Sequence, residues 1–208
     1  MLTTQNLSYT YASGTALKFP DISLEEDEDL LILGASGVGK TTLLHLMGGL
    51  LKPDSGSITL ANQGIQKLSQ RKMDTFRGEH IGIVFQKAIF IQSLSVIDNI
   101  KAKLFFTETT LSTEDITSLL TTLNLVDKKD SLVQKLSEGQ KQRLSIAIAL
   151  SNKPKLILAD EPTASLDDLN AKNVITLLLS EARKQKANLV VITHDHRIKE
   201  YFSKTIEL

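Results

Sequence analysis

A glycine-rich segment, residues 34–42, restricts the possible folds of this chain more than any other feature. It fits the pattern GxxxxGK[ST] and lies between an apolar run, Leu30–Leu33, and a stretch with helical spacing. Glycines here let backbone N–H groups surround a phosphate, and the N-terminus of the following helix favours negative charge. The segment therefore predicts a phosphate-binding loop made of Gly34, Ala35, Ser36, Gly37, Val38, Gly39, Lys40, Thr41 and Thr42.

Two side chains of this loop have separate expected roles. Lys40 should reach the β- and γ-phosphates of a nucleotide, and the Thr41 hydroxyl should ligate Mg²⁺. A glycine-rich turn without a ligand is the alternative, and the flanking strand and helix patterns argue against it.

The composition is that of an ordinary globular chain. Its 208 residues include 24 Lys+Arg and 24 Asp+Glu, and 41% of them are apolar, which suits one domain. Because the formal net charge is zero, we expect no nucleic-acid partner. The lack of cysteine excludes disulfides, thiolate metal sites and a cysteine nucleophile.

We expect the chain to stay in the cytoplasm. Residues Met1 to Tyr9 are polar and mixed, so no secretory signal is indicated. No stretch has the roughly 20 apolar residues that cross a bilayer. Any role at a membrane would therefore depend on a partner there.

The order of β-prone and helical segments predicts an α/β fold. Short β-prone runs make the opening, Leu2–Leu33, a small and mostly antiparallel layer, with Leu30–Leu33 as its last run. Strands then alternate with helices, which argues for a partly parallel sheet. Apolar residues in 87–150 recur at helical spacing, so we expect a helical insertion there. The expected later elements are strands at Ser57–Leu60, Ile81–Phe85, Leu156–Asp160, Leu189–Thr193 and Thr205–Leu208, and helices at Gly39–Gly49, Glu138–Leu150, Asp168–Lys184 and His196–Phe202.

Two adjacent carboxylates follow one of the apolar runs. Asp160 ends the run Leu156–Asp160 and is expected to hold Mg²⁺, either directly or through a bound water. Glu161 comes next and is our candidate general base, because it would point toward the γ-phosphate and could polarise a water. The alternative is that the pair begins a turn before Pro162.

The segment Leu136-Ser137-Glu138-Gly139-Gln140 resembles the signature motif of the ATP-binding cassette (ABC) ATPases, which other P-loop families lack. Further segments of the chain resemble the remaining motifs of this family, in the family's order. They are Tyr11 for the adenine-stacking aromatic, Gln86 for the glutamine loop and a Mg²⁺ ligand, Ser165-Leu166-Asp167 for the D-loop, and His194 for the switch histidine. The resemblance covers nearly the whole chain.

The resemblance implies the fold and the ligands. The fold is a P-loop NTPase core with a mixed sheet, an N-terminal antiparallel β-subdomain and an inserted α-helical subdomain, within one domain over residues 1–208. ATP and Mg²⁺ are the implied ligands, and Glu161 and His194 the implied catalytic pair. For Tyr11 two alternatives stay open: a core strand position, or Tyr9 as the stacking residue.

The resemblance also implies a head-to-tail dimer. Ser137, Gly139 and Gln140 of one chain would bind the ATP held by the other, and Asp167 would contact across the interface. A serine cap followed by a flexible glycine is the plain alternative. Glu138 departs from the usual glycine; it places a negative charge near a phosphate site, yet it favours the dipole of its own helix.

Residues 76–86 resemble the lipoprotein-release, macrolide-export and cell-division group of the family. This implies an ATPase subunit, peripheral on the cytoplasmic face of the membrane, that drives integral permease subunits. The alternative is a soluble regulator without a transport partner, such as a cell-division factor. The apolar residues of 87–95 are either the docking surface for the partner or part of the helical subdomain's own core.

Overall fold

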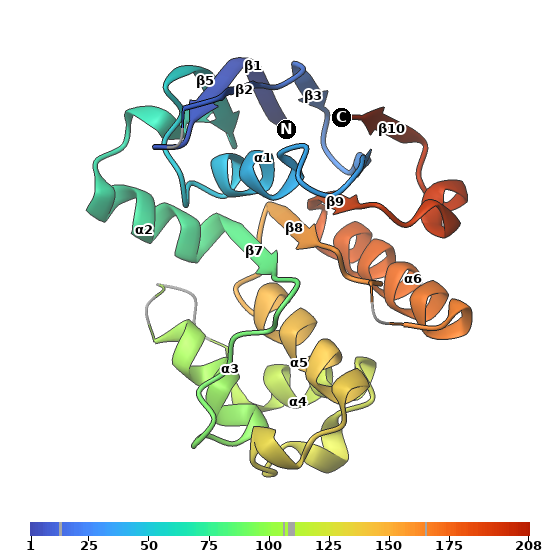
Figure 1. Ribbon diagram of the computed structural model, residues 1–208. Coiled ribbons are helices and arrows are strands. Elements are labelled where there is room, and N and C mark those ends of the chain that lie inside the picture. The colour runs from blue at the N-terminus through green and yellow to red at the C-terminus, as the bar shows by residue number, and fades with distance from the viewer. Residues whose placement is uncertain (13, 106, 108–110, 165) are drawn as a thin grey trace.

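The computed structural model of the chain describes all residues except 13, 106, 108–110 and 165. Its layers are stacked in the order antiparallel sheet, helix, parallel sheet, helices (Figure 1). The predicted α/β class is confirmed.

The central layer is a parallel sheet of strand order β10-β4-β9-β8-β7. Its side chains alternate between two hydrophobic cores: Leu31 and Leu33 of β4 enter one, and Leu30 and Ile32 the other. Both faces of the sheet are therefore buried, as the continuous apolar runs predicted. The strands are β4 (Asp29–Leu33), β7 (Ile81–Val84), β8 (Leu156–Asp160), β9 (Asn188–Thr193) and β10 (Lys204–Glu207).

The second layer is an antiparallel sheet in which β1 pairs with β2, β3 and β5. The strands are β1 (Leu2–Thr10), β2 (Ala16–Lys18), β3 (Ile22–Leu24), β5 (Ser55–Leu60) and β6 (Gln63–Gly64). Two strand assignments were wrong. The run Leu30–Leu33 lies in the parallel sheet rather than in the opening layer, and Ser57–Leu60 lies in the antiparallel sheet.

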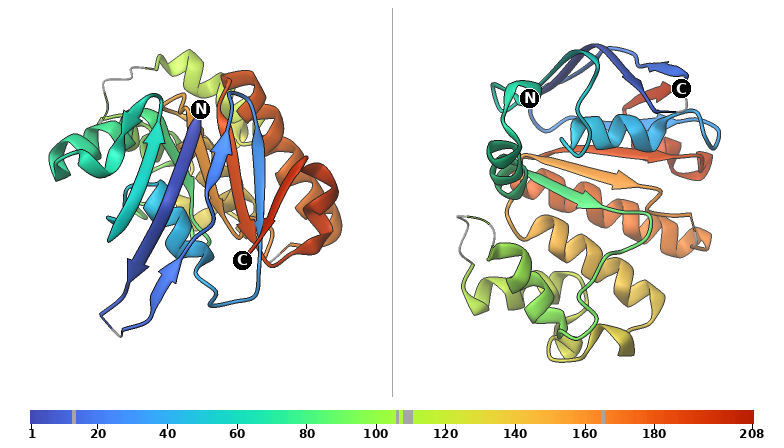
Figure 2. Two further views of the ribbon diagram at one scale, coloured as in Figure 1. Left: turned by 90° about the horizontal axis from the view of Figure 1, so that it is seen from above. Right: turned by 60° about the vertical axis from the view of Figure 1, so that its left-hand side comes forward.

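Helix α1 (Lys40–Met47) lies between the two sheets, and α5 (Glu138–Leu150) and α6 (Asp168–Gln185) cover the other face of the parallel sheet (Figure 2). The helices and turns that the structure describes in 87–150 begin at residue 96; besides α5 they are α3 (Val96–Leu104), α4 (Thr113–Thr122) and short 3₁₀ turns at Val126–Lys128 and Val133–Lys135. The helical insertion is thus confirmed there, while residues 87–95 form a non-helical connection. Two further 3₁₀ turns are Ile65–Lys67 and His196–Tyr201.

One helix, α2 (Gln70–His80), was not predicted. Met73 is its only buried residue, so no apolar stripe with helical period is present in its sequence. It leads directly into β7 and places Arg77 and Asp74 beside that strand.

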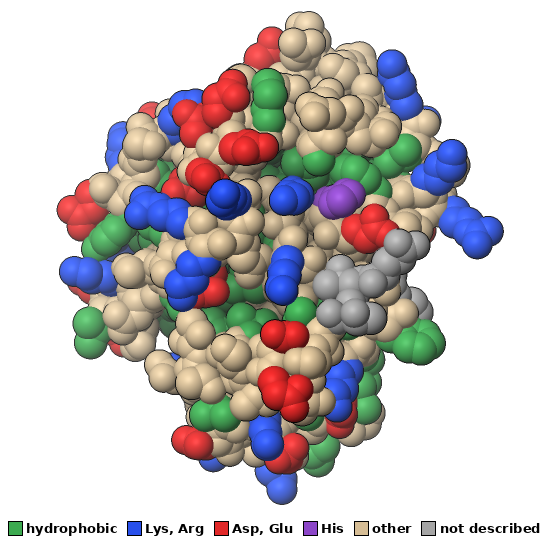
Figure 3. Space-filling view, turned by 180° about the vertical axis from the view of Figure 1, so that it is seen from behind, with side chains coloured by type: hydrophobic (Ala, Val, Ile, Leu, Met, Phe, Trp, Pro, Cys, Tyr) green, Lys and Arg blue, Asp and Glu red, His purple; other side chains and the backbone are tan. Residues whose placement is uncertain are grey.

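On the face seen in Figure 3, Lys and Arg side chains lie across the middle, with Asp and Glu side chains above and below them. Among the residues that the structure describes, no helix is both long enough and apolar enough to span a membrane.

Candidate nucleotide site

The loop after β4 has the backbone that its glycines predicted. Gly37 and Gly39 have φ of 85° and 106°, a region that residues with a Cβ rarely adopt. Gly34 is needed for another reason, since a Cβ there would lie 2.8 Å from the backbone oxygen of Leu208. Leu208, whose backbone N–H donates to the Leu33 carbonyl at 2.9 Å, thus lies directly against the start of the loop.

Lys40 begins α1 and is buried, with 6% of its surface exposed. Its Nζ donates hydrogen bonds to the Gly34 and Ala35 carbonyls at 2.8 and 2.9 Å, and lies 3.7 Å from Oε1 of Glu161. The ammonium group is therefore held inside the curve of the loop.

A cavity of about 210 Å³ opens over this loop. Three segments that are distant in sequence meet there: the loop, the turn after β7 and the turn after β8. Its lining residues are Ser36, Gly37, Gly39, Lys40, Thr41, Thr42, Gln86 and Glu161. The structure thus brings Gln86 and Glu161 to the loop as expected.

Thr41 and Asp160 form the part of the site that fits a metal ion. The Thr41 hydroxyl donates to Oδ2 of Asp160 at 3.1 Å, while Oδ1 is buried and has no hydrogen-bond partner among the residues that the structure describes. Burial raises the pKa of Asp160, against the hydrogen bond from Thr41. A hydroxyl and one carboxylate suit Mg²⁺, which prefers few protein oxygens together with waters and phosphates. The described residues contain no group of three or more His, Asp or Glu able to hold a metal alone.

Glu161 and His194 meet at the ends of β8 and β9. His194 Nδ1 lies 3.0 Å from Oε1 of Glu161, and Thr193 donates its hydroxyl to Oε2 at 2.6 Å. Burial acts to raise the pKa of Glu161, but the hydrogen bonds from Thr193 and His194 outweigh it, so the pKa is lowered. Glu161 also has a left-handed φ of 48°, a strained conformation that is typical of functional positions.

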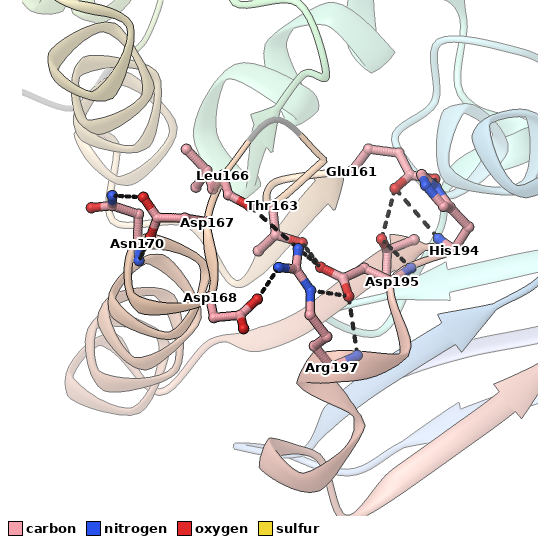
Figure 4. Close-up of polar contacts among 10 residues, drawn as sticks. Glu161, Thr163, Leu166, Asp167, Asp168, Asn170, His194, Asp195 and Arg197 are labelled. Carbon is pink, nitrogen blue, oxygen red and sulfur yellow. Dashed lines mark hydrogen bonds and ion pairs between the residues drawn. The ribbon is translucent and has the colours of Figure 1, made fainter.

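A polar network behind this pair was not predicted (Figure 4). Asp195 is buried and accepts from Arg197 Nε and Nη2, both at 2.8 Å, and from the Thr163 hydroxyl at 2.9 Å. Arg197 also forms an ion pair with Asp168 and donates to the Leu166 carbonyl at 3.4 Å. The hydrogen bonds from Arg197 lower the pKa of Asp195 to about 2, against its burial. Arg197 thus connects the turn after β9 to the start of α6.

Tyr11 lies just past β1, and 44% of its surface is exposed. Its hydroxyl is 2.9 Å from Oγ1 of Thr42, and its ring packs edge-on against Tyr9 with centroids 4.9 Å apart. Tyr9 packs against the core under the antiparallel sheet. Tyr9 therefore packs against the core, whereas Tyr11 does not.

The segment Ser137–Gln140 caps α5. The Ser137 hydroxyl accepts from the backbone N–H of Gln140 at 3.3 Å, and the Gln140 side chain accepts from the backbone N–H of Ser137 at 3.0 Å. A Cβ on Gly139 would meet no atom of the described residues within 4 Å. No residue of this segment lines the cavity over the loop.

Glu138 points outward, with 89% of its side chain exposed, and its Oε1 lies 2.7 Å from Nζ of Lys141. Lys141 thus balances the negative charge of Glu138, the residue that departs from the family pattern.

Asp167 is the N-cap of α6, where it accepts from the backbone and side chain of Asn170 at 2.9 and 2.7 Å. Ser165, which begins the predicted D-loop, lies outside the described residues.

Residues 17–164 match the family described as ABC transporter. The lipoprotein-releasing system ATP-binding protein LolD of Legionella pneumophila (strain Lens) is 35% identical over 100% of this chain and 94% of its own length. The macrolide export ATP-binding/permease protein MacB of Rhodopirellula baltica is 34% identical over 92% of this chain but only 29% of its own length.

Solved structures of ATP-binding cassettes are also similar to this chain. The ATP-binding cassette MJ0796, in a dimeric post-hydrolysis state bound to ADP and Pi, has a TM-score of 0.89 and 31% identity, covering 100% of this chain and 94% of its own. The protein cbiO1 of Clostridium perfringens, part of the transporter complex cbiONQ, has a TM-score of 0.87 and 30% identity, covering 99% and 83%.

Proposed function

This chain belongs to the ABC transporter family of ATPases, and we propose that it is the ATP-hydrolysing subunit of an export or lipoprotein-release complex. One observation carries the proposal most directly: Lys40, Thr41 and Glu161 line one cavity. Behind them, Asp160 accepts a hydrogen bond from Thr41, and His194 lies 3.0 Å from Glu161. The names of the relatives LolD and MacB support the choice of group.

Binding of ATP uses the loop and its neighbours. Loop N–H groups and Lys40 bind the phosphates, whose oxygens take the place of the Gly34 and Ala35 carbonyls as acceptors for Lys40. Tyr11 stacks its exposed ring on the adenine. Thr41, Asp160 and Gln86 would hold Mg²⁺, which would supply positive charge beside the phosphates.

Hydrolysis is assigned to Glu161 and His194. Glu161 is ionised at neutral pH because its pKa is lowered, so it can accept a hydrogen bond from the attacking water and orient it. Thr193 and the Nδ1 atom of His194 fix both carboxylate oxygens. This leaves Nε2 of the imidazole to contact the γ-phosphate.

The site is completed by a second chain. Ser137, Gly139 and Gln140 lie at the N-terminus of α5, which favours a bound anion, but they do not line the chain's own cavity. In a head-to-tail dimer they bind the γ-phosphate held by the partner, and Asp167 lies at the same interface. The dimeric MJ0796 cassette bound to ADP and Pi supports this arrangement.

The dimer works on the cytoplasmic face of a membrane beneath integral permease subunits. The name of MacB includes both an ATP-binding and a permease part. The region of MacB that matches this chain is 29% of the protein, which leaves room for the permease in the same chain. The whole of residues 1–208 acts as one nucleotide-binding domain, with its helical subdomain inserted at about 87–150.

The test is ATP turnover by the purified chain with Lys40→Ala, and with Lys199→Ala as an exposed control. Lys40→Ala should lose at least 100-fold of the rate, because the phosphate-binding cation inside the loop is removed. Lys199→Ala should keep wild-type turnover. Undiminished turnover in Lys40→Ala would refute the assignment of the loop.

A further inference from the structure

Arg197 lies behind the nucleotide site, on the 3₁₀ turn that follows β9 (Figure 4). Its guanidinium group donates to both carboxylate oxygens of Asp195 at 2.8 Å and to the Leu166 carbonyl at 3.4 Å, and it also pairs with Asp168 at the start of α6. A planar group with five N–H donors can reach all of these acceptors at once, which a lysine ammonium cannot. Arg197 therefore holds the turn after β9 against residues 166–168.

A chain of hydrogen bonds continues from Asp195 to the candidate general base. The backbone N–H of Asp195 donates to Oγ1 of Thr193 at 3.0 Å, and that hydroxyl donates to Oε2 of Glu161 at 2.6 Å. Thr193 and Asp195 are both buried, so water competes little for these contacts. Each member of the chain from Arg197 to Glu161 thus contacts the next.

The single hydrogen of the Thr193 hydroxyl gives this chain its direction. Because the hydroxyl oxygen accepts from the Asp195 N–H, its own hydrogen is directed to Glu161. The Asp195 carboxylate is fixed in turn by Arg197 and by the Thr163 hydroxyl at 2.9 Å. Removal of Arg197 leaves a buried carboxylate without its cation, and a shift of the turn after β9 would relieve that cost. Such a shift would move the Asp195 N–H and let the Thr193 hydroxyl rotate away from Glu161.

The orientation of a reacting group has a large effect on rate, since an error of about 1 Å can cost about 100-fold. We infer that Arg197 is a positioning residue for hydrolysis, which acts through Asp195 and Thr193 to hold the Glu161 carboxylate toward the attacking water. Arg197 is not one of the described residues that line the cavity over the loop, so it affects the chemical step and not the binding of ATP. This rests on the proposed function, which assigns the attacking water to Glu161.

The test compares ATP turnover by the purified full chain with Arg197→Met, with Thr193→Val and with both, under conditions in which circular dichroism shows each to be folded. Arg197→Met should lower kcat about tenfold and leave KM for ATP within about twofold of wild type, because the phosphate-binding groups are unchanged. Thr193→Val removes the hydroxyl but keeps the size of the side chain, and it should lower kcat at least as much. Lys199→Met, an exposed lysine on the same turn, should keep the wild-type values.

The double variant separates a positioning role from a structural one. If Arg197 acts through Thr193, adding Arg197→Met to Thr193→Val should change kcat by less than about twofold, because the connection to Glu161 is already lost. Independent effects would instead multiply to about 100-fold, and that result would overturn the inference. Arg197→Lys keeps a cation beside Asp195 without the forked contacts, so it should recover part of kcat; it takes the place of Arg197→Met in the comparison if the latter does not fold.

Wild-type kcat in folded Arg197→Met would overturn the inference and leave the proposed function intact, because Lys40→Ala tests that function separately. A change in KM without a change in kcat would also overturn it, since Arg197 would then act on ATP binding. If the wild-type chain itself does not hydrolyse ATP, the proposed function fails and the inference fails with it.

Discussion

Replacing Arg197 by Met removes the cation that holds Asp195, and the structure gives the size of the expected effect. The pKa of Asp195 is lowered from 3.8 to about 2, chiefly by Arg197. A lowering of this size corresponds to about 2 kcal/mol of stability at neutral pH. Asp195 is buried, but 45% of the Arg197 side chain is exposed, so solvent screening makes this value the upper end of the expected effect. The ion pair of Arg197 with the exposed Asp168 should add only a few tenths of a kcal/mol.

The direction of the pKa shift of Asp195 decides how the stabilisation depends on pH. Because the folded pKa lies below the unfolded value, the stabilisation is present above about pH 4 and is lost as the pH falls toward 2. Arg197→Met should therefore lower the free energy of unfolding by about 2 kcal/mol at pH 7, and its difference from wild type should shrink below pH 4.

Urea unfolding, followed by circular dichroism, measures this difference. A double-mutant cycle with Asp195→Asn should give a coupling energy of about 2 kcal/mol at pH 7. Lys199→Met is the matched control, because Lys199 lies on the same turn in an exposed pair with Glu207 at 3.4 Å; its effect should stay below about 0.5 kcal/mol. A coupling energy below about 0.5 kcal/mol would refute the role assigned to Arg197.

Two further predictions concern charges away from the cavity. Asp29 is buried, its Oδ1 has no hydrogen-bond partner within the described part of the chain, and burial raises its pKa to about 6. The stability that depends on its protonated form is lost as the pH rises from about 4 to 6. Asp29→Asn should therefore stabilise the chain by up to about 3 kcal/mol at pH 7 and remove this pH dependence in urea titrations, and a less stable variant would contradict the argument. Lys141→Gln leaves Glu138 unbalanced at the signature segment, so in a Glu161→Gln background it should raise the ATP concentration needed for dimerisation about threefold or more, and adding Glu138→Gly should reverse the change. An unchanged midpoint by light scattering would mean that Glu138 stays clear of the phosphate.

The sequence allowed a good prediction of the parts of the fold that depend on local pattern. The loop 34–42, its flanking strand and helix, and the apolar runs of β8 and β9 are each marked by consecutive residues. The pairing of strands is not local. The run Leu30–Leu33 has the same β pattern as its neighbours, and only its parallel partners β9 and β10 place it in the central sheet. Helix α2 was missed because a polar helix with one buried residue has no periodic signal.

The candidate site also contains residues that the sequence predicts and residues that it does not. Lys40, Asp160 and Glu161 stand in motifs, so their residue types could be predicted. Arg197 pairs with Asp195 and also with Asp168. Arg197 and Asp168 are 29 residues apart in the sequence, and only the fold brings them together. A charged pair two residues apart is common in any chain, so no sequence signal marks it.

The central claim is that ATP closes two copies of this chain around sites that Glu161 then hydrolyses. The most direct measurement is the molar mass of the Glu161→Gln variant by light scattering with Mg·ATP and with Mg·ADP. We predict a dimer with ATP and a monomer with ADP, together with loss of turnover, since the variant keeps the binding site but lacks the base. A monomer at saturating Mg·ATP, or turnover equal to wild type, would contradict the account.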